Sequence, residues 1–433
     1  MQPLDVGVIG CGTAGSAAAV FLARQGHRVT VYERVPSPGP VGAGITIQPT
    51  GLHVLCRLGL YNHIVSRGSR IDSLVCERIA GKKRKSLIEL TYEDVGEGLF
   101  GVGLHRGVLF EALLAAVRVE PNISLRTGVE IVDLARGVPK PNDVRARSTY
   151  LVDVDRNRHG PHDLVVVADG ARSQLRDDTG TSQRVERYPW GALWFVAVDK
   201  RKKDEPSRRV LHQIVDGNQR MLGILPTGKG PVSQETSLAP SPPLVSLFWS
   251  IHGERVAAWR ERGVEKWKEE VHEIAPEAEP ILEQIHDEGQ LLFAAYHDVV
   301  MHRWSTRNVV YLGDAAHATS PQLGQGCNLA LWDAMELGDC IAAEERDLTR
   351  ALDCYTRRRA DHLAFYQLAT RWLTPFFQGD IASLGALRDV TMPLMCKLSP
   401  FRRLMTLSML GVMEGFLGKT LVLQLPRGES MLA

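Results

Sequence analysis

The stretch VGVIGCGTAGSAAAVFLARQGHRVTVYE, residues 6–33, decides the fold. Residues 6–9 form a short apolar run typical of a buried parallel strand, and the glycines after it allow a tight turn against a phosphate. The small residues 16–23 predict a helix whose free N–H groups face that phosphate. Residues 28–32 predict a second strand, which ends at Glu33, an acid about 20 residues beyond the glycines that can bind a ribose. This βαβ pattern predicts a dinucleotide site but does not distinguish NAD from FAD.

Two later segments favour FAD. Residues 163–168 and 309–312 fit two further buried strands, which end at Asp169-Gly170 and Gly313-Asp314. Because ligands of a doubly wound sheet bind beyond the carboxyl ends of its strands, these acids are expected near the same ligand. The glycines of residues 324–326 then leave room for a flavin ring beside the start of a helix.

Taken in order, these segments resemble the class A flavoprotein monooxygenases of the para-hydroxybenzoate hydroxylase fold, including salicylate hydroxylase-like and ubiquinone hydroxylase-like members. The resemblance covers residues 1 to about 345 and is carried by five motifs. They are GCGTAG with Glu33, GAGITIQPTGLHVLCRLGL, LHRGVLFEALL, DGARSQLR and GDAAHATSPQLGQGCNLALWDA. Membership of such a family does not name a substrate.

The resemblance implies a set of cofactor-binding residues. In the first half of the chain they are Gly10, Gly12, Thr13, Ala14 and Gly15 around the pyrophosphate, Glu33 and Arg34 at the adenosine, and Arg106 at the phosphates and ribityl chain. In the second half they are Asp169, Gly313, Asp314, Pro321, Gly324, Gly326, Cys327 and Asn328. Asp169 is implied near the pyrophosphate and NAD(P)H, Asp314 at the ribityl chain or pyrophosphate, and residues 324–328 at the flavin ring. His317 is interpreted as structural.

The resemblance also implies an activity: an FAD-dependent monooxygenase that uses NADH or NADPH and O₂ to hydroxylate an aromatic or polycyclic small molecule. In such enzymes a flavin C4a-hydroperoxide carries the chemistry, so no catalytic side chain is assigned. Two alternatives stay open, a flavin-retaining cyclase or ligand-binding protein of the same fold, and another flavin oxidoreductase. A halogenase is disfavoured, because residues 249–252 (WSIH) do not match the W-x-W-x-I-P motif of the halogenating relatives.

We expect an α/β fold with three units. A Rossmann-like FAD-binding domain of the para-hydroxybenzoate hydroxylase type takes residues 1–75, 100–180 and 295–345, an antiparallel β substrate domain takes 76–99 and 181–294, and a helical C-terminal region takes 346–433. Strand-like pieces at 190–198, 210–214, 220–225 and 244–251 build the substrate domain. Their period-two pattern selects candidates for the roof over the flavin, namely Trp194, His212, Met221, Leu225, Phe248 and Trp249.

The C-terminal region has two interpretations. Residues 404–425 are apolar, but Glu414 and Lys419 interrupt them, so a transmembrane helix is not expected. Met405, Met409 and Met413 recur at four-residue spacing, which fits a helix face packed on the core. The alternative is a substrate-access lid or a weak contact with a membrane surface.

Composition limits the partners. The 51 Lys and Arg residues against 50 Asp and Glu residues give a net charge of +1, which provides no basic surplus for nucleic acid. Seven scattered cysteines without metal-ligand spacing predict reduced thiols, no metal site and a cytoplasmic location. We expect no signal peptide, because the first strand follows Met1 closely. No cluster of arginines or tyrosines indicates a carboxylate, so the expected substrate is largely apolar.

Overall fold

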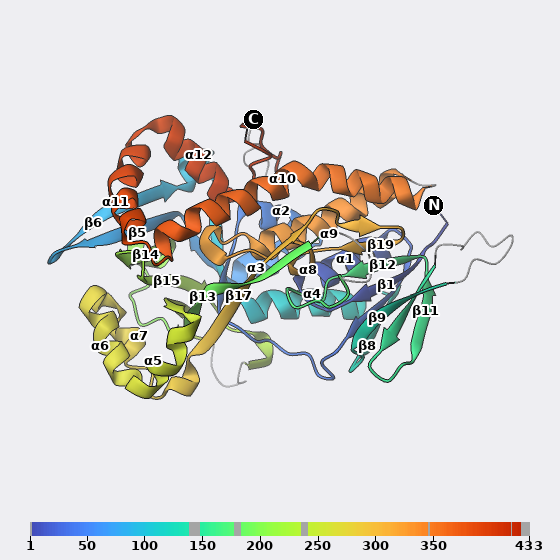
Figure 1. The fold of residues 1–433 in the computed structure, drawn as a ribbon, viewed down its shortest axis with the longest axis horizontal. Helices are drawn as coiled ribbons and strands as arrows, with labels where there is room; N and C mark the ends of the chain where they lie inside the picture. Colours follow the sequence, from blue (N-terminus) through green and yellow to red (C-terminus); the bar gives the residue numbers. More distant parts are fainter. Residues whose placement is uncertain are drawn as a thin grey trace.

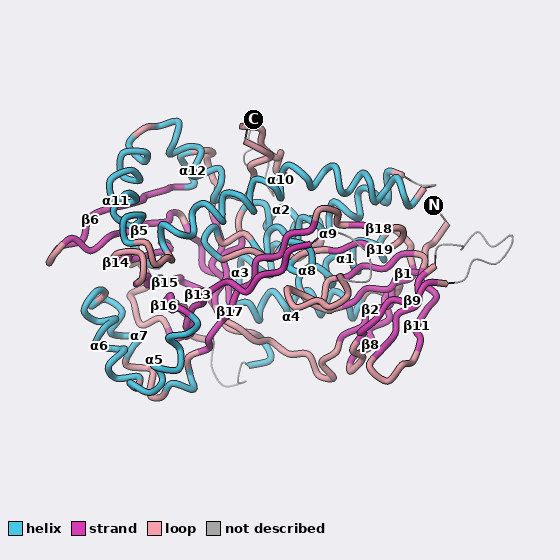
Figure 2. The backbone as a smooth tube through the Cα atoms, viewed as in Figure 1, coloured by secondary structure: helices cyan, strands magenta, loops and turns pink. Residues whose placement is uncertain are grey.

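The computed structural model describes residues 2–137, 148–176, 183–234, 241–344, 347–416 and 418–425. The predicted domain boundaries at 180/181 and 345/346, and residues 426–433 of the tail, involve residues outside these ranges. Within the described part, two large sheets lie toward opposite ends of an elongated molecule, and a long helix runs along both (Figure 1). Figure 2 shows that helices cover most of the side from which the C-terminus emerges.

The first large sheet contains the strands predicted from the glycine motifs. Its order is β18-β19-β12-β1-β2-β8, and the strands from β19 to β8 are parallel. They are β1 (Asp5–Ile9), β2 (Arg28–Glu33), β8 (Ile123–Thr127), β12 (Leu164–Val167), β18 (Ser305–Thr306) and β19 (Val309–Tyr311). Because parallel strands share one direction, the three glycine motifs leave the sheet at the same edge.

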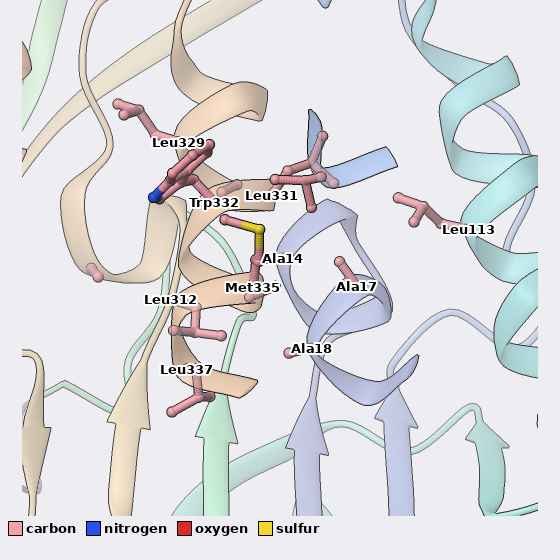
Figure 3. Packing of buried hydrophobic residues seen from close by; sticks show 14 of the residues in the cluster. Ala14, Ala17, Ala18, Leu113, Leu312, Leu329, Leu331, Trp332, Met335 and Leu337 are labelled. Carbon is pink, nitrogen blue, oxygen red and sulfur yellow. The ribbon is translucent and has the colours of Figure 1, made fainter. Parts of the chain in front are cut away.

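Small side chains position the helix that follows β1. Figure 3 shows Ala17 and Ala18 of α1 (Thr13–Arg24) between α4 (Arg106–Val119), which carries Leu113, and α9 (Gly326–Ala343), which carries Met335. All these side chains are buried in one core. The alanines let the α1 backbone approach its neighbours closely, so α1 and α9 begin beside each other at the edge of the sheet.

The second large sheet separates two hydrophobic cores. Its order is β17-β13-β16-β15-β14-β5-β6, and all neighbours are antiparallel except β14 and β5. The strands are β5 (Ser73–Ala80), β6 (Lys83–Thr91), β13 (Gln183–Val198), β14 (Val210–Asp216), β15 (Arg220–Gly228), β16 (Leu244–His252) and β17 (Leu292–Met301). The predicted boundaries at 75/76 and 294/295 therefore fall inside β5 and β17.

One face of this sheet is covered by three short helices, which enclose Trp259 and Trp267 in a separate core. They are α5 (Val256–Arg262), α6 (Val264–Ile274) and α7 (Glu279–Leu282). The other face turns toward the first core, where β14 to β16 contribute Val215, Met221, Leu225 and Phe248. We call it the flavin-side face, and the face under α5 to α7 the outer face.

The remaining elements pack around the two large sheets (Figure 1). One small sheet contains β3 (Gly44–Ile47), β7 (Gly101–His105) and β4 (Ser69–Ile71), and another contains β9 (Ile131–Arg136), β10 (Thr149–Asp153) and β11 (Arg158–His162). The other helices are α2 (Pro49–Arg57), α3 (Tyr61–Arg67), α8 (Asp314–His317), α10 (Leu348–Phe377), α11 (Ala382–Lys397) and α12 (Ser399–Leu410). Helix α10 packs antiparallel to α9 as a hairpin, and we call the end where α9 finishes and α10 starts its closed end.

The tail differs from its prediction in one respect. Helix α12 ends at Leu410 and Gly411 has a φ of 88°, so Met413 lies beyond the helix and the three methionines do not form one helical face. Met409 and Met413 are nevertheless buried in the first core, as packing requires. Leu387, Val390 and Leu394 of α11 remain exposed. Within the described residues, no helix has the length and apolar character needed to span a bilayer.

Candidate functional site

Close backbone approaches bring the three glycine motifs together. A Cβ at Gly10 would lie 2.5 Å from the Ala168 carbonyl oxygen, and the φ of Gly10 is 95°, so only glycine fits there. A Cβ at Gly15 would lie 2.0 Å from the Gly10 oxygen. On the other side, a Cβ at Gly313 would lie 3.0 Å from the Cβ of Ala14. The first motif therefore touches both later motifs, as the parallel sheet predicts.

Other glycines of the same motifs face open space. A Cβ at Gly12, Gly170, Gly324 or Gly326 would meet no heavy atom of the described chain within 4 Å. Helix α1 begins after Gly12 and α9 begins at Gly326, and neither N-cap residue, Gly12 or Gln325, supplies a side-chain capping hydrogen bond. Their first N–H groups can therefore bind an anion or a carbonyl. This open backbone fits a pyrophosphate at Gly12 and a flavin ring at Gly324 and Gly326.

Two of the three predicted acids, Glu33 and Asp169, differ in their surroundings. The Oε2 atom of Glu33 accepts a hydrogen bond from Cys11 N at 2.9 Å, and Oε1 accepts one from Val35 N at 2.9 Å. These bonds hold the carboxylate beside the first glycine loop and leave one lone pair on each oxygen for a ribose. Asp169 Oδ1, by contrast, is buried without a hydrogen-bond partner in the described chain. An orphaned acceptor at this position fits a ligand donor.

Charged side chains surround Asp169 and the flavin-edge loop, which we define as residues 320–328. Burial raises the pKa of Asp169, while Ser173, Arg176 and Arg34 oppose the rise. Asp314 is exposed at the start of α8.

Arg106, at the start of α4, converges on the flavin-edge loop. The Arg106 side chain lies close to Gly42, because a Cβ built on Gly42 would be 3.1 Å from Arg106 Cδ. Burial raises the pKa of Cys327 to about 12, with Arg106 lowering it and Asp314 raising it. Both charges therefore act on Cys327, although Arg106 comes from a different motif from Asp314 and Cys327.

The Asn328 side chain holds the flavin-edge loop in place. Its Oδ1 accepts from Gln48 N at 2.9 Å, and its Nδ2 donates to the carbonyl oxygens of Thr46 at 3.1 Å and Gly324 at 3.2 Å. The side chain therefore fastens the flavin-edge loop to β3, and main-chain groups are left to face a ligand. Pro321 begins the 3-10 turn that enters this loop.

A buried carboxylate that sequence reasoning missed supports the third motif. Asp333 Oδ2 accepts from Gly313 N at 2.8 Å and from His317 Nε2 at 2.6 Å, and Oδ1 accepts from Arg359 Nε at 2.7 Å. Burial raises the pKa of Asp333, but the stronger effect of His317 and Arg359 lowers it to about 2. His317 thus has a structural partner. An acid inside the apolar run 329–337 was the signal available in the sequence.

The end of α12 is fastened to the flavin-edge loop, which the sequence also did not show. Gln325 Nε2 donates to the Met409 carbonyl oxygen at 2.6 Å. Thr50 Oγ1 donates to the Leu410 oxygen at 3.1 Å, and His362 Nε2 donates to the Gly411 oxygen at 2.8 Å. These bonds support the packing interpretation for this part of the tail.

An aromatic cluster lies on the flavin-side face of the second sheet. Trp194 and Phe248 are cross-strand partners, with ring centroids 5.0 Å apart. Phe248 lies over Gly223, where a Cβ would come within 1.9 Å of its ring. Tyr296, which sequence reasoning missed, accepts a hydrogen bond from Trp194 Nε1 at 3.2 Å. Burial raises the pKa of Tyr296 to about 12, so it is a neutral phenol. The signal available in the sequence was an aromatic residue inside the strand-like run LFAAYHDVVM, residues 292–301.

The flavin-side face meets the flavin loops from two directions. At one end, Gly44 packs against Ser246, since a Cβ built on Gly44 would lie 2.7 Å from Ser246 Oγ. Ser246 is two residues before Phe248 on β16. At the other end, Gln378 Nε2 donates to Ser250 Oγ at 2.7 Å. Four residues earlier on α10, the hydroxyl of Thr374 is 2.8 Å from that of Ser320. Phe248 therefore lies between two points at which the sheet is joined to flavin-site segments.

The structure does not bring all six roof candidates to this face. Met221 and Leu225 lie in the first core with Phe248. His212 pairs across the sheet with Ile224, an outer-face residue, and its Nε2 is 2.9 Å from Glu77 Oε2. Trp249 packs edge-on against Trp267 under α6. Because neighbouring strand residues point to opposite faces, His212 and Trp249 leave the set of pocket candidates.

A cavity of about 730 Å³ lies elsewhere, toward α5. Its walls include Trp190, Trp249, Trp259 and Arg255, and it contains none of the predicted cofactor residues. We place the functional site at the glycine loops, because the open backbone and the orphaned Asp169 oxygen are found there.

Comparisons with known proteins identify the family. The family described as FAD binding domain matches residues 3–366. The chain belongs to this family. A probable 2-heptyl-3-hydroxy-4(1H)-quinolone synthase of Rhodococcus erythropolis is 28% identical over 353 residues, covering 81% of this chain and 82% of the relative. The 6-methylpretetramide 4-monooxygenase of Streptomyces rimosus is 29% identical over 364 residues, covering 82% and 80%.

Solved structures share the fold. PqsL of Pseudomonas aeruginosa, in complex with 2-aminobenzoylacetate, has a TM-score of 0.73 at 22% identity and covers 89% of this chain and 100% of that one. The tetrameric form of 2-methyl-3-hydroxypyridine-5-carboxylic acid oxygenase has a TM-score of 0.70 at 20% identity and covers 96% and 99%. The predicted fold class and the resemblance to class A FAD-dependent monooxygenases are confirmed. This chain is an FAD-dependent monooxygenase.

Proposed function

We propose that this monooxygenase uses NADH or NADPH and O₂ to hydroxylate an aromatic or polycyclic, largely apolar small molecule. The observation that carries the proposal is the aromatic cluster of Trp194, Phe248 and Tyr296 on the face that joins the flavin-edge loop. Bound FAD supplies the redox chemistry, taking electrons from the nicotinamide and activating O₂. The protein's own part is to hold the substrate ring beside the flavin and to keep water out.

In this proposal, different cofactor residues bind different parts of FAD. Gly12 and the start of α1 hold the pyrophosphate, while Glu33 binds the adenosine ribose. Arg106 and Asp314 hold the ribityl and phosphate groups beside Cys327. Main-chain N–H groups at the start of α9 face the flavin ring, where they stabilise negative charge on the reduced flavin.

The polar groups of the substrate face are neutral. The Tyr296 oxygen already accepts the Trp194 N–H, so its own O–H can donate to a substrate oxygen. The buried hydroxyls of Thr227 and Ser246 have no hydrogen-bond partner in the described chain and offer further polar contacts. Arg201 and Arg208 in the neighbouring connector are both paired with Asp199, at 2.9 and 3.0 Å. This arrangement supports a substrate that is a ring compound with hydroxyl or carbonyl groups, rather than a substrate that carries a carboxylate.

Reduction of the bound flavin tests the function. We expect the purified protein to bind FAD, and NADH or NADPH to bleach it faster in the presence of a matching phenolic or polycyclic compound, with O₂ consumed afterwards. A screen of such compounds by stimulated nicotinamide oxidation would identify the substrate class. Product formation without flavin reduction would instead support the cyclase alternative, and a protein that takes up no FAD would contradict the proposal.

Substitutions on the two faces of β16 test the substrate face. Phe248→Ala and Trp194→Ala are expected to raise the KM of the stimulating compound by about tenfold, because each removes roughly 1 to 2 kcal/mol of ring contact. Trp249→Phe is the matched control, since it changes the next residue on the outer face and should leave KM unchanged. Steady-state nicotinamide oxidation measures KM for the alanine variants and for the control. An unchanged KM in the two alanine variants would show that the aromatic cluster does not line the substrate pocket.

Two coarser proposals remain. The two large sheets support a division into a flavin unit and a substrate unit. All seven cysteines are free, which supports a reducing, cytoplasmic location.

A further inference from the structure

Two cysteines meet at the closed end of the hairpin of α9 and α10. The Sγ atoms of Cys340 and Cys354 are 3.0 Å apart, and the residues are 14 positions apart in the chain. Both are free thiols. A disulfide bond measures about 2.05 Å, so joining these two atoms requires a movement of only about 1 Å.

The helices around the two thiols are held in register. Arg358 Nη1 donates to Glu336 Oε2 at 3.2 Å, one turn from each cysteine along its helix. Further along, the buried Arg359 and Asp333 side chains are also paired. These contacts follow an antiparallel alignment in which Cys340 faces Cys354. The thiol contact therefore belongs to the packing of the hairpin rather than to a chance orientation of a surface side chain.

We propose that Cys340 and Cys354 form a peroxide-sensitive thiol pair that closes to an intramolecular disulfide. Cys354 is partly exposed, whereas Cys340 is fully buried, so a peroxide reaches Cys354 first. The Cys354 thiol is oxidised to the sulfenic acid, and the peroxide O–O bond breaks to give water when the oxidant is H₂O₂. The Cys340 sulfur then displaces the sulfenic oxygen as a second water, and the S–S bond forms.

The groups around Cys340 affect the rate at which the disulfide forms. Burial and the neighbouring Cys354 thiol raise the pKa of Cys340, so little thiolate is present and closure is slow near neutral pH. The nearby Arg358 opposes this rise. The source of oxidant rests on the proposed function, because a flavin oxygenase that reduces O₂ without hydroxylating a substrate releases H₂O₂. Helix α9 begins in the flavin-edge loop, so the disulfide would lock the far end of the same helix.

Peptide mapping after oxidation tests the proposal. Flavin-loaded full-length protein is treated with added H₂O₂, alkylated under denaturing conditions and digested without reductant. We expect a peptide pair linked through Cys340 and Cys354 that increases with the oxidant dose and disappears after reduction. Cys56 is an internal comparator, because it is equally half-buried and has no thiol contact among the described residues. It should be recovered as a single thiol or its oxide, never cross-linked.

Single substitutions distinguish the order of events. Cys340→Ser is expected to leave Cys354 as a sulfenic acid that a dimedone probe traps, whereas Cys354→Ser should leave Cys340 alkylated and unoxidised. The proposal is overturned if both wild-type thiols are alkylated at a dose that oxidises half of Cys56, or if Cys354 proceeds to the sulfinic acid without cross-linking. Added peroxide makes the outcome independent of whether the enzyme hydroxylates the proposed substrates.

Discussion

Gly12→Val is expected to weaken FAD binding strongly while leaving the fold intact. A Cβ at this position would meet no heavy atom of the described chain within 4 Å, and the backbone there, with φ −81° and ψ −166°, is one that valine adopts readily. The new side chain therefore strains nothing in the protein itself. It enters the space in front of the α1 N-terminus, where the pyrophosphate is proposed to lie.

The loss should be large, because the valine displaces a doubly charged group from several N–H donors at once. We expect the Kd for FAD to rise by about 100-fold or more, which corresponds to roughly 3 kcal/mol. Quenching of flavin fluorescence during titration of the flavin-free protein measures this Kd. Thermal unfolding of the flavin-free protein supplies the second measurement, and its midpoint should stay within about 2 °C of wild type.

Gly39→Val is the matched control. Gly39 also has no heavy atom of the described chain within 4 Å of a built Cβ, but it lies in an exposed loop outside the three motifs. It should change neither the FAD affinity nor the midpoint. If Gly12→Val binds FAD as tightly as wild type, the pyrophosphate does not lie at α1. If its midpoint falls sharply, the substitution disturbs the fold and the loss of FAD cannot be assigned to the pyrophosphate site.

The contrast between Gly10 and Gly12 illustrates what the sequence reveals. Both were predicted from one motif, since parallel strands and glycine turns depend on neighbouring residues. Their separate roles, close contact for Gly10 and open space for Gly12, depend on a strand that comes more than 150 residues later. Local pattern therefore predicted the flavin loops, and only the assembled sheet shows which glycine touches protein and which faces a ligand.

The substrate face was harder to predict for a related reason. Period-two alternation groups the residues of one strand into two faces, but it does not say which face turns toward the flavin. Phe248 and Trp249 are adjacent and equally aromatic, and they lie on opposite sides of β16. Tyr296 belongs to β17, which joins β13 at the edge of the sheet from a distant part of the chain. Its place beside Trp194 depends on that pairing.

Asp333→Asn is expected to cause the largest loss of stability among single substitutions in this region. The side chains of Asp333 and Arg359 are both 0% exposed, so the substitution leaves a guanidinium buried without its counter-charge. Breaking such a pair costs about 3 to 5 kcal/mol in the free energy of unfolding. Chemical denaturation monitored by tryptophan fluorescence measures the change.

Asp339→Asn, on the same helix, provides the comparison. Asp339 and Arg57 are joined by two short hydrogen bonds at 2.6 and 2.7 Å, but their side chains are 32% and 39% exposed. Solvent screens that pair, and its loss should cost less than about 1 kcal/mol. The double variant Asp333→Asn with Arg359→Met should recover part of the lost stability, because it removes the unpaired charge. A double variant no more stable than Asp333→Asn would contradict the ion-pair explanation.

The pH dependence gives an independent test of the same residue. The folded pKa of Asp333 is about 2, below its ordinary value of 3.8, so ionisation stabilises the fold above about pH 4 and this contribution is lost as the pH falls toward 2. Wild type should therefore lose stability more steeply than Asp333→Asn between pH 5 and about 2. Because Asp333 also accepts the Gly313 N–H at 2.8 Å, the variant should release FAD more readily at neutral pH, before it unfolds. If the free energy of unfolding falls equally steeply with decreasing pH in the two proteins, Asp333 is not the ionised group that joins the third motif to α10.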